Sequence, residues 1–339
     1  MRQPWIHNAK SDFWWILSPS FIILLIIFLF QKQIEALQSE NNFYVWLFLI
    51  VFVDVSHVYS TLFKTYFVKK EVQSRKLLYY GLPIFSFVFC VILYQFGSLV
   101  FWSVLALIAV FHFIRQQYGF MRLYARFEPN DFHKKIDEIT IYSATIYPML
   151  YWFAKPRNFT WFVENEFQWM GKLPNYIPFI TIVYFIVIGI WLLKTIIVYL
   201  KFKEFNIPKN AVIIGTLLSW YFGIVYFNND LIFTLLNVIS HGVPYMALVY
   251  LKEIKQKSDE DLMWLKIFKK GFGVLFFLIF LFSIAFSEEF FWEILDWKEH
   301  VSFLDFEISS FLMMIVVPLL AMPQLTHYLL DGFIWKRKK

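Results

Sequence analysis

The chain has 339 residues, of which 59% are hydrophobic, 22% are aromatic and only 17% are charged. A soluble domain of this length carries far more charge, so the composition excludes an ordinary globular protein and indicates a polytopic membrane protein. The formal net charge of +6 does not imply nucleic acid, because Lys and Arg lie in short clusters between apolar runs, where they report membrane topology.

Apolar stretches of about 20 residues, the length that crosses a bilayer as a helix, recur along the whole chain. They predict ten spans, near 14–31, 43–64, 77–97, 99–122, 137–154, 176–200, 210–228, 230–251, 267–287 and 308–335. The first run resembles a signal-peptide core, but it contains Pro19 and lacks a small-residue cleavage pattern, so we expect a retained helix. Residues 1–339 are therefore expected to form a single all-α transmembrane domain.

Most of the 31 Lys and Arg residues fall in the segments that share the N-terminal side of these ten spans. The positive-inside rule then places both termini in the cytoplasm, and an odd number of spans would have mixed the two sides. We expect an integral protein of the inner, cytoplasmic membrane.

Two segments on the outer side are long. Residues 155–175 mix Trp, Phe and charged residues as an interfacial helix does. Residues 287–307 are acidic and include Glu288, Glu289 and Glu293. Charge runs are usually solvated, so we expect a loop there, along the outer surface.

The polar residues inside the spans provide the functional signal. One histidine lies on each of four even-numbered spans: His57, His112, His241 and His327. These spans run in the same direction, and the histidines lie at similar distances from the next Lys or Arg, with a spread of only about 6 Å at the helical rise. Because such groups are costly in lipid, one layer of four in the cytoplasmic half predicts a metal or proton site.

Each of these histidines has a polar residue one helical turn away, on the same face. Metal-bound imidazoles usually donate their second N–H to such a partner, which fixes the ring. The partners, for which we predict supporting or catalytic roles, are Asp54, Gln116, Asn237, Tyr245 and Asp331. Direct ligation by Asp54 or Asp331 is the alternative, and the sequence leaves both open. Arg115 is expected to pair with one of these aspartates or to extend to the headgroups.

Imidazole ligands suit iron, zinc and copper, and thiolate ligation is excluded because Cys90 is the single cysteine. Two haems need ligand pairs at two depths, and membrane desaturases need His-x-x-x-His boxes. The chain offers neither pattern, so we expect a bare metal ion, with Fe(II) favoured over zinc or copper.

Four motifs carry a resemblance to a known family: DVSHVYST (54–61), FHFIRQQYGF (111–120), ISHGVPYMALVY (239–250) and PQLTHYLLDGFIW (323–335). They resemble the histidine motifs of the bacterial β-carotene dioxygenases, the Brp/Blh family. The last matches best, through His327, Leu330 and Asp331, whereas Tyr245 stands where the third motif has a second histidine. The resemblance implies a non-haem Fe(II) centre held by the four histidines, with Tyr245 beside it. It also implies O2 and an unsaturated lipid-like or isoprenoid molecule as substrates.

Two other functions stay open at this point. The same His and Asp residues could serve a transporter for protons or a metal ion, although the outer halves of their spans offer few polar residues. They could also form a structural metal site in a lipid-modifying membrane protein. No protein partner is indicated by the loops.

Overall fold

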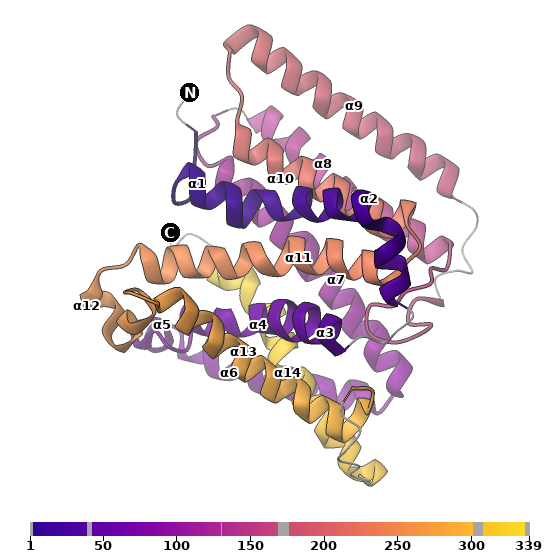
Figure 1. Ribbon diagram of the computed structural model, residues 1–339, viewed down its shortest axis with the longest axis vertical. Helices are drawn as coiled ribbons and strands as arrows, with labels where there is room; N and C mark the ends of the chain where they lie inside the picture. Colours follow the sequence, from indigo (N-terminus) through magenta and orange to yellow (C-terminus); the bar gives the residue numbers. More distant parts are fainter. Residues whose placement is uncertain (1–2, 39–42, 130, 169–175, 301–307, 336–339) are drawn as a thin grey trace. The chain divides into compact units, whose positions relative to one another are not determined.

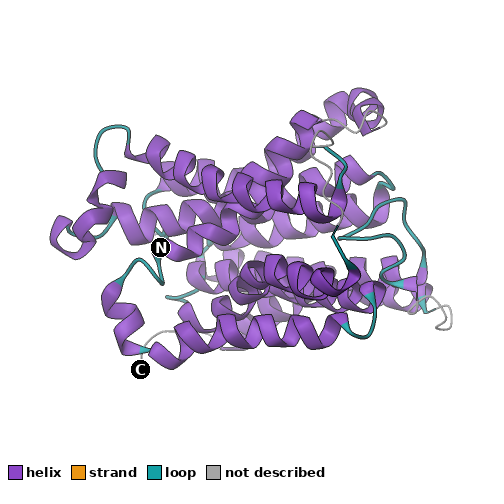
Figure 2. Cartoon of the chain, turned by 90° about the horizontal axis from the view of Figure 1, so that it is seen from below, coloured by secondary structure: helices purple, strands orange, loops and turns teal. Residues whose placement is uncertain are grey.

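The computed structural model describes residues 3–38, 43–129, 131–168, 176–300 and 308–335. Within these ranges the regular structure is helical and no strand occurs (Figures 1 and 2), which confirms the predicted all-α class. The chain divides into two compact units. Unit 1 comprises Met1–Asn41 and Phe113–Pro244, and unit 2 comprises Asn42–His112 and Tyr245–Lys339.

Eight segments of the described residues are helical, long and apolar enough to cross a membrane: Ala9–Leu37, Phe43–Phe63, Lys76–Tyr94, Ser98–Tyr124, Ile177–Phe202, Asp230–Lys255, Gly273–Trp297 and Ser310–Ile334. They coincide with eight of the ten predicted spans. The other two predictions, 137–154 and 210–228, fall on α8 (Asp131–Ala154) and on α10 (Ile207–Trp220) with the π-helical turn η5 (Tyr221–Tyr226). Both are helical, but neither is among the eight.

Unit 1 contains α1 (Ala9–Asp12), η1 (Phe13–Leu17), α2 (Ser18–Gln38), α8, α9 (Ile177–Phe202), α10, η5, the later part of α7 (Ser98–Tyr124) and the earlier part of α11 (Asp230–Val249). In this unit α8 packs against α9 and α10, and α10 packs against α2. Local sequence sets the helix ends. The Asn206 side chain caps α10 by accepting the Lys209 N–H at 3.1 Å, and Lys203 ends α9 in the left-handed conformation, with φ 54°.

Unit 2 contains the remaining parts of α7 and α11 together with α3 (Phe43–Trp46), η2 (Leu47–Val55), α4 (Ser56–Ser60), η3 (Thr61–Phe63), α5 (Lys69–Ser74), α6 (Lys76–Tyr94), η6 (Tyr250–Lys255), α12 (Asp259–Leu262), η7 (Met263–Phe268), α13 (Gly273–Trp292), η8 (Glu293–Trp297) and α14 (Ser310–Ile334). In this unit α14 packs along α6, and α13 packs against η2 and α4. These contacts surround the short helix α4, which carries His57.

The π-helical segment η2 determines which way α4 faces. Its wider turns end at Ser56, whose backbone N–H and side-chain hydroxyl both reach the carbonyl of Val51, the hydroxyl at 3.0 Å. A π-helical turn shifts the following residues around the helix axis relative to regular α-helical spacing. The direction in which His57 points therefore depends on this irregular segment.

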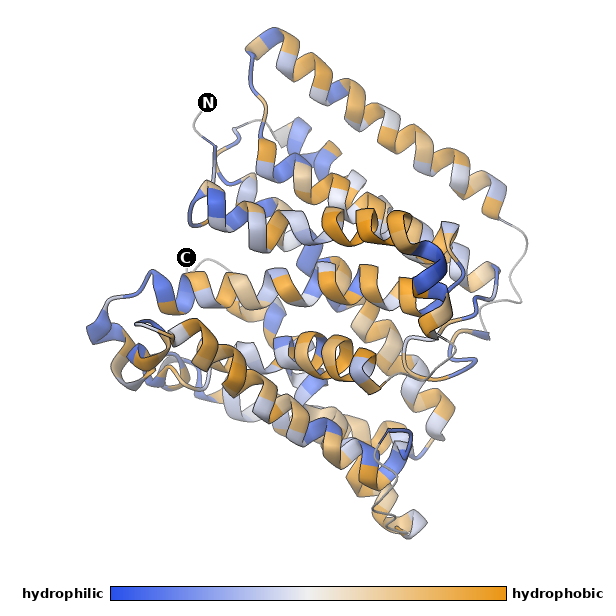
Figure 3. Cartoon of the chain, in the orientation of Figure 1, coloured by the Kyte–Doolittle hydropathy of each residue, from blue (hydrophilic) through white to orange (hydrophobic). Residues whose placement is uncertain are grey.

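Long helices in both units expose apolar side chains. In α6 and in α9, only 17% of the most apolar 18-residue stretch is buried. On α9, the side chains of Phe179 and Leu193 are 70% and 59% exposed. Figure 3 shows α9 coloured as hydrophobic along most of its length. Surfaces of this kind require an apolar solvent, so the chain is a membrane protein.

The predicted interfacial helix over 155–175 is wrong for its described part. Residues 155–168 form bends and turns, and residues 169–175 lie outside the described ranges. The carboxylate of Glu166 organises this loop, since it accepts the backbone N–H groups of Trp161, of Phe162 at 2.9 Å and of Val163 at 3.2 Å. Burial raises the pKa of Glu166 above its usual range, although these three donors oppose the shift.

The acidic run is not a solvated loop where the structure describes it. Helix α13 continues through Glu288 and Glu289, and η8 adds residues to Trp297. Glu288, Glu289 and Glu293 are 6%, 7% and 1% exposed. Packing of α13 against η2 and α4 buries them, which charge patterning along the sequence could not reveal.

Candidate metal centre in unit 2

Three of the four predicted histidines lie together in unit 2, each on a different helix. His57 is on α4, His112 on α7 and His327 on α14, and their exposed fractions are 1%, 3% and 2%. Neutral imidazoles at this burial need polar partners. The cluster therefore has to be accounted for by hydrogen bonds or by a bound cation.

The ring nitrogens of these histidines converge. His327 Nε2 lies 3.2 Å from His112 Nε2. The His57 ring centroid lies 5.0 Å from that of His327, and nitrogen atoms of His57 and His112 lie within 4.8 Å of each other. Tyr328 stacks on His112, with ring centroids 4.7 Å apart.

A chain of hydrogen bonds leads away from His327. Its Nδ1 atom lies 2.7 Å from Thr61 Oγ1, and Thr61 Oγ1 lies 3.1 Å from the Tyr245 hydroxyl oxygen. The Tyr245 hydroxyl donates to Asp331 Oδ1 at 2.5 Å. All four side chains belong to unit 2.

The order of donors in this chain fixes the tautomer of His327. Tyr245 has one hydroxyl proton, and it is used toward Asp331, so the Thr61 hydroxyl donates to Tyr245. Thr61 Oγ1 then accepts from His327 Nδ1–H. In the neutral imidazole the other nitrogen carries a lone pair, so His327 Nε2 presents a lone pair to His112.

The separation of the two Nε2 atoms fits a shared metal ion. Nitrogen ligands at about 2.05 Å from one ion are about 2.9 Å apart at right angles and about 3.35 Å apart in a tetrahedron. The observed 3.2 Å between His112 and His327 falls between these values. Without a metal ion, the same distance fits a hydrogen bond from the Nε2–H of His112 to the Nε2 lone pair of His327. With the nearby ring of His57, the centre offers three buried imidazoles, and imidazole nitrogen is a suitable ligand for iron, zinc or copper.

Two carboxylates flank the histidines, but not as the sequence predicted in each case. Asp54 Oδ1 lies 3.6 Å from His57 Nδ1, as its spacing suggested. Asp331 was predicted to support His327, whereas its Oδ2 lies 3.7 Å from His112 Nδ1 and its other oxygen accepts from Tyr245. The partner of His327 is instead Thr61, the first residue of η3.

The other predicted site residues belong to unit 1. The His241 ring stacks on Phe113, with centroids 3.5 Å apart and planes 4° apart. Gln116 donates to the His241 carbonyl at 2.8 Å, and Asn237 donates within its helix to the Phe233 carbonyl at 3.0 Å. Metal binding by His241 and the supporting or catalytic roles of Gln116 and Asn237 stay predictions.

Arg115 also belongs to unit 1, where its side chain is exposed. It donates a hydrogen bond to the Tyr142 hydroxyl and lies over the Tyr118 ring, 4.8 Å from the centroid. Tyrosine partners thus take the place of the aspartates that the sequence suggested.

One group of this centre, Thr61, and two buried carboxylates of the same unit, Glu288 and Glu289, were not predicted from the sequence. Thr61 was overlooked because hydroxyl side chains in membrane helices usually bond their own backbone. Glu288 and Glu289 were assigned to a loop, yet Glu288 is buried in unit 2 and accepts a hydrogen bond from the Tyr59 hydroxyl, two residues after His57. The sequence signal for a buried partner was Tyr59, a polar residue on the same span as Asp54 and His57.

No protein-family model matches the chain, and neither the curated proteins nor the solved structures compared with it give a significant match. The resemblance to the β-carotene dioxygenases therefore rests on the four short motifs alone. Function has to be argued from the residues of the centre.

Proposed function

We propose that unit 2 binds a transition-metal ion through His57, His112 and His327 and that the chain is an intramembrane non-haem iron oxygenase. The observation that carries this proposal is the pair of Nε2 atoms, 3.2 Å apart, with the hydrogen-bond order leaving a lone pair on His327. Its substrate is a hydrophobic unsaturated molecule, lipid-like or isoprenoid, together with O2.

The membrane topology is part of the proposal. Ten spans with both termini in the cytoplasm agree with the distribution of Lys and Arg, and α8 and α10 supply the two helices beyond the eight most apolar ones. With this topology the centre lies in the cytoplasmic half of the inner membrane, open to substrates that partition into lipid.

The protein supplies a dry and ordered environment. The three histidines are almost fully buried, and the hydrogen bonds from Thr61 through Tyr245 to Asp331 hold the His327 ring in one orientation. An iron(II) ion held by imidazoles would supply the activation of O2, which is otherwise slow to react with unsaturated hydrocarbons. Tyr245 and Asp331 keep a proton close to the ligand set.

Oxygen consumption tests the enzymatic part of the proposal. The purified chain is loaded anaerobically with Fe(II) and given air and a membrane lipid extract. We expect O2 uptake that requires both iron and extract, with an oxygenated lipid identified by mass spectrometry. The His327→Ala variant should abolish uptake, whereas His7→Ala, which changes a histidine before α1, should leave it intact. Metal binding without lipid-dependent O2 uptake would leave only a structural metal site.

Transport of protons or a metal ion is the second candidate. The sequence argued against transport because the outer halves of the histidine-bearing spans offer few polar residues. The buried carboxyl groups of Glu288 and Glu289, in the same unit as the centre, favour it. Flux across liposomes that contain the protein separates the two functions. An oxygenase gives no flux. A transporter gives flux that Glu288→Gln reduces, and it takes up no O2.

A further inference from the structure

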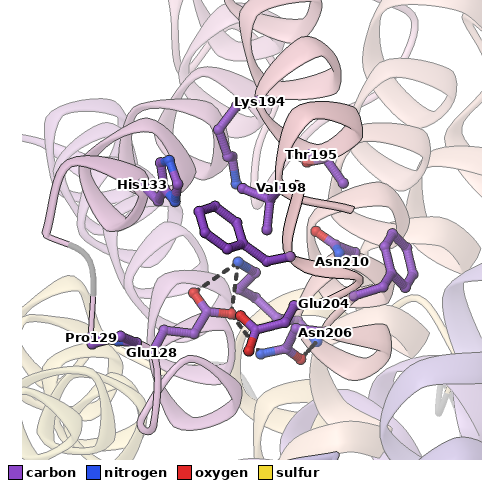
Figure 4. Close-up of a pocket in the computed structure, with 12 residues that line it drawn as sticks. Glu128, Pro129, His133, Lys194, Thr195, Val198, Glu204, Asn206 and Asn210 are labelled. Carbon is purple, nitrogen blue, oxygen red and sulfur yellow. Dashed lines mark hydrogen bonds and ion pairs between the residues drawn. The ribbon is translucent and has the colours of Figure 1, made fainter. Parts of the chain in front are cut away.

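Unit 1 contains a cavity of about 250 Å³ between α8, α9, α10 and the segment that follows α7 (Figure 4). This volume is far larger than the roughly 30 Å³ of one water molecule. It is just below the range of about 300–1,000 Å³ for pockets that enclose a complete drug-sized ligand. The space suits a polar headgroup whose attached chains remain outside.

Two buried lysines, Lys194 and Lys209, line the cavity, and carboxylates compensate their charges. Asp137, only 1% exposed, accepts hydrogen bonds from Lys194, from Lys209 at 2.7 Å and from the Trp191 indole at 3.0 Å. Lys209 also pairs with Glu128 at 2.9 Å. Two ammonium groups thus meet two carboxylates, so this group of four side chains has no net charge.

Two polar groups on the wall are incompletely paired among the described residues. Lys194 has three N–H donors and is 8% exposed, and among the described residues its hydrogen bond goes to Asp137. Asn210 is 4% exposed, and its Oδ1 atom is buried with no hydrogen-bond partner in the described part of the chain. Such buried groups are normally satisfied. A ligand at this position should therefore offer an acceptor to Lys194 and a donor to Asn210.

The rim of the cavity adds a negative charge and an apolar face. Glu204 is exposed at the rim, and in the view of Figure 4 it lies on the opposite side of the cavity from Lys194. Val198 and Phe202 form the apolar side, on the helix α9 that exposes most of its apolar residues, with Phe202 62% exposed. A phosphate as acceptor, a primary ammonium group as donor and apolar acyl chains are the three parts of an aminophospholipid.

We propose that this cavity binds the headgroup of an aminophospholipid. The phosphate oxygens accept hydrogen bonds from Lys194, and the primary ammonium group donates to Asn210 Oδ1 and faces Glu204. The acyl chains lie along Val198 and Phe202. The proposal does not depend on the metal centre of unit 2.

Native mass spectrometry of the full-length protein in detergent tests this assignment. The probes are short-chain phosphatidylethanolamine, the phosphatidylglycerol and phosphatidylcholine of equal chain length, free phosphoethanolamine and inorganic phosphate. We expect one phosphatidylethanolamine per chain, bound at least 10-fold more tightly than the other two lipids, since a charged hydrogen bond lost costs about 1.5–3 kcal/mol. Free phosphoethanolamine and phosphate should bind weakly because they lack the chains.

Variants separate the contributions of Glu204 and Asn210. Glu204→Gln, an exposed substitution, should reduce the preference for phosphatidylethanolamine over phosphatidylglycerol, and Asn210→Leu should weaken binding about 10-fold. The control Lys201→Gln changes an exposed charge on the same helix that does not line the cavity. Equal binding of all three lipids, an unchanged preference in Glu204→Gln, or binding of free phosphoethanolamine as tight as that of the lipid would overturn the proposal.

Discussion

Thr61 is the residue on which the geometry of the metal centre depends most. It is 266 positions from His327 in sequence, yet its hydroxyl lies 2.7 Å from the Nδ1 atom of that ring. Its second contact, to Tyr245, fixes which atom donates to which, and so leaves the lone pair of His327 facing His112. A single hydroxyl group thus determines the tautomer of a proposed ligand.

Replacing Thr61 by valine keeps the shape and removes this hydroxyl. We expect metal affinity to fall about 10- to 100-fold, the usual effect of losing a group that orients a ligand histidine. Thr61→Ser restores the hydroxyl and should return affinity to within a few-fold of the wild type. Competition titration with a metal-binding dye gives the affinities. If serine fails to rescue, or if valine has no effect, Thr61 only fills space.

The helices show what sequence patterns can and cannot predict at the scale of an element. Apolar length and the clustering of Lys and Arg predicted where the eight most apolar spans lie, because lipid imposes both features on a single helix. The bounds agree less well at the acidic run, where the span predicted to end at 287 continues as a helix to Trp297. The π-helical segment Leu47–Val55 and the burial of Glu288 were not predictable in this way. They depend on how α13 packs against η2 and α4, which no pattern within one helix encodes.

The contact between η5 and α11 offers a test of packing in unit 1. A methyl group added at Gly223 would lie 2.9 Å from Asn237 Nδ2 and 3.5 Å from Leu236 Cβ. The amide of Asn237 would have to move, which strains its bond to the Phe233 carbonyl. We expect Gly223→Ala to lower the free energy of unfolding by about 1–3 kcal/mol.

Gly189 is the matched control for that substitution, because an added methyl group meets nothing within 4 Å at this exposed position of α9. Gly189→Ala should leave stability unchanged or raise it by up to about 1 kcal/mol, since alanine favours the helix. Thermal unfolding in detergent measures both variants. Equal effects of the two substitutions would mean that the contact at Gly223 is looser than described.

At the scale of the whole molecule, the sequence predicted that histidines far apart in the chain share one depth. The structure brings His57, His112 and His327 together within unit 2. What the sequence could not give is the pairing across helices, such as Asp331 beside His112, because spacing along one helix identifies only neighbours one turn away. Depth follows from topology, whereas partners follow from packing.

Topology itself is testable because Cys90 is the single cysteine and is buried. In a Cys90→Ser background, cysteines are placed singly at Asn158 and Lys203, both exposed. With ten spans, a membrane-impermeant maleimide labels position 158 from outside the cell and position 203 only after the membrane is opened. If 137–154 and 210–228 do not cross, the two positions exchange sides.

The central claim is that buried histidines of unit 2 hold a metal ion, and metal analysis of the purified protein tests it most directly. After loading with Fe(II), Zn(II) or Cu(II) and removal of the free ion, mass spectrometry should find one bound ion per chain. His112→Ala and His327→Ala should retain less than about a tenth of it, and His7→Ala should retain all of it. Wild-type protein that binds none of the three ions, or a His327→Ala variant that keeps a full equivalent, would contradict the account.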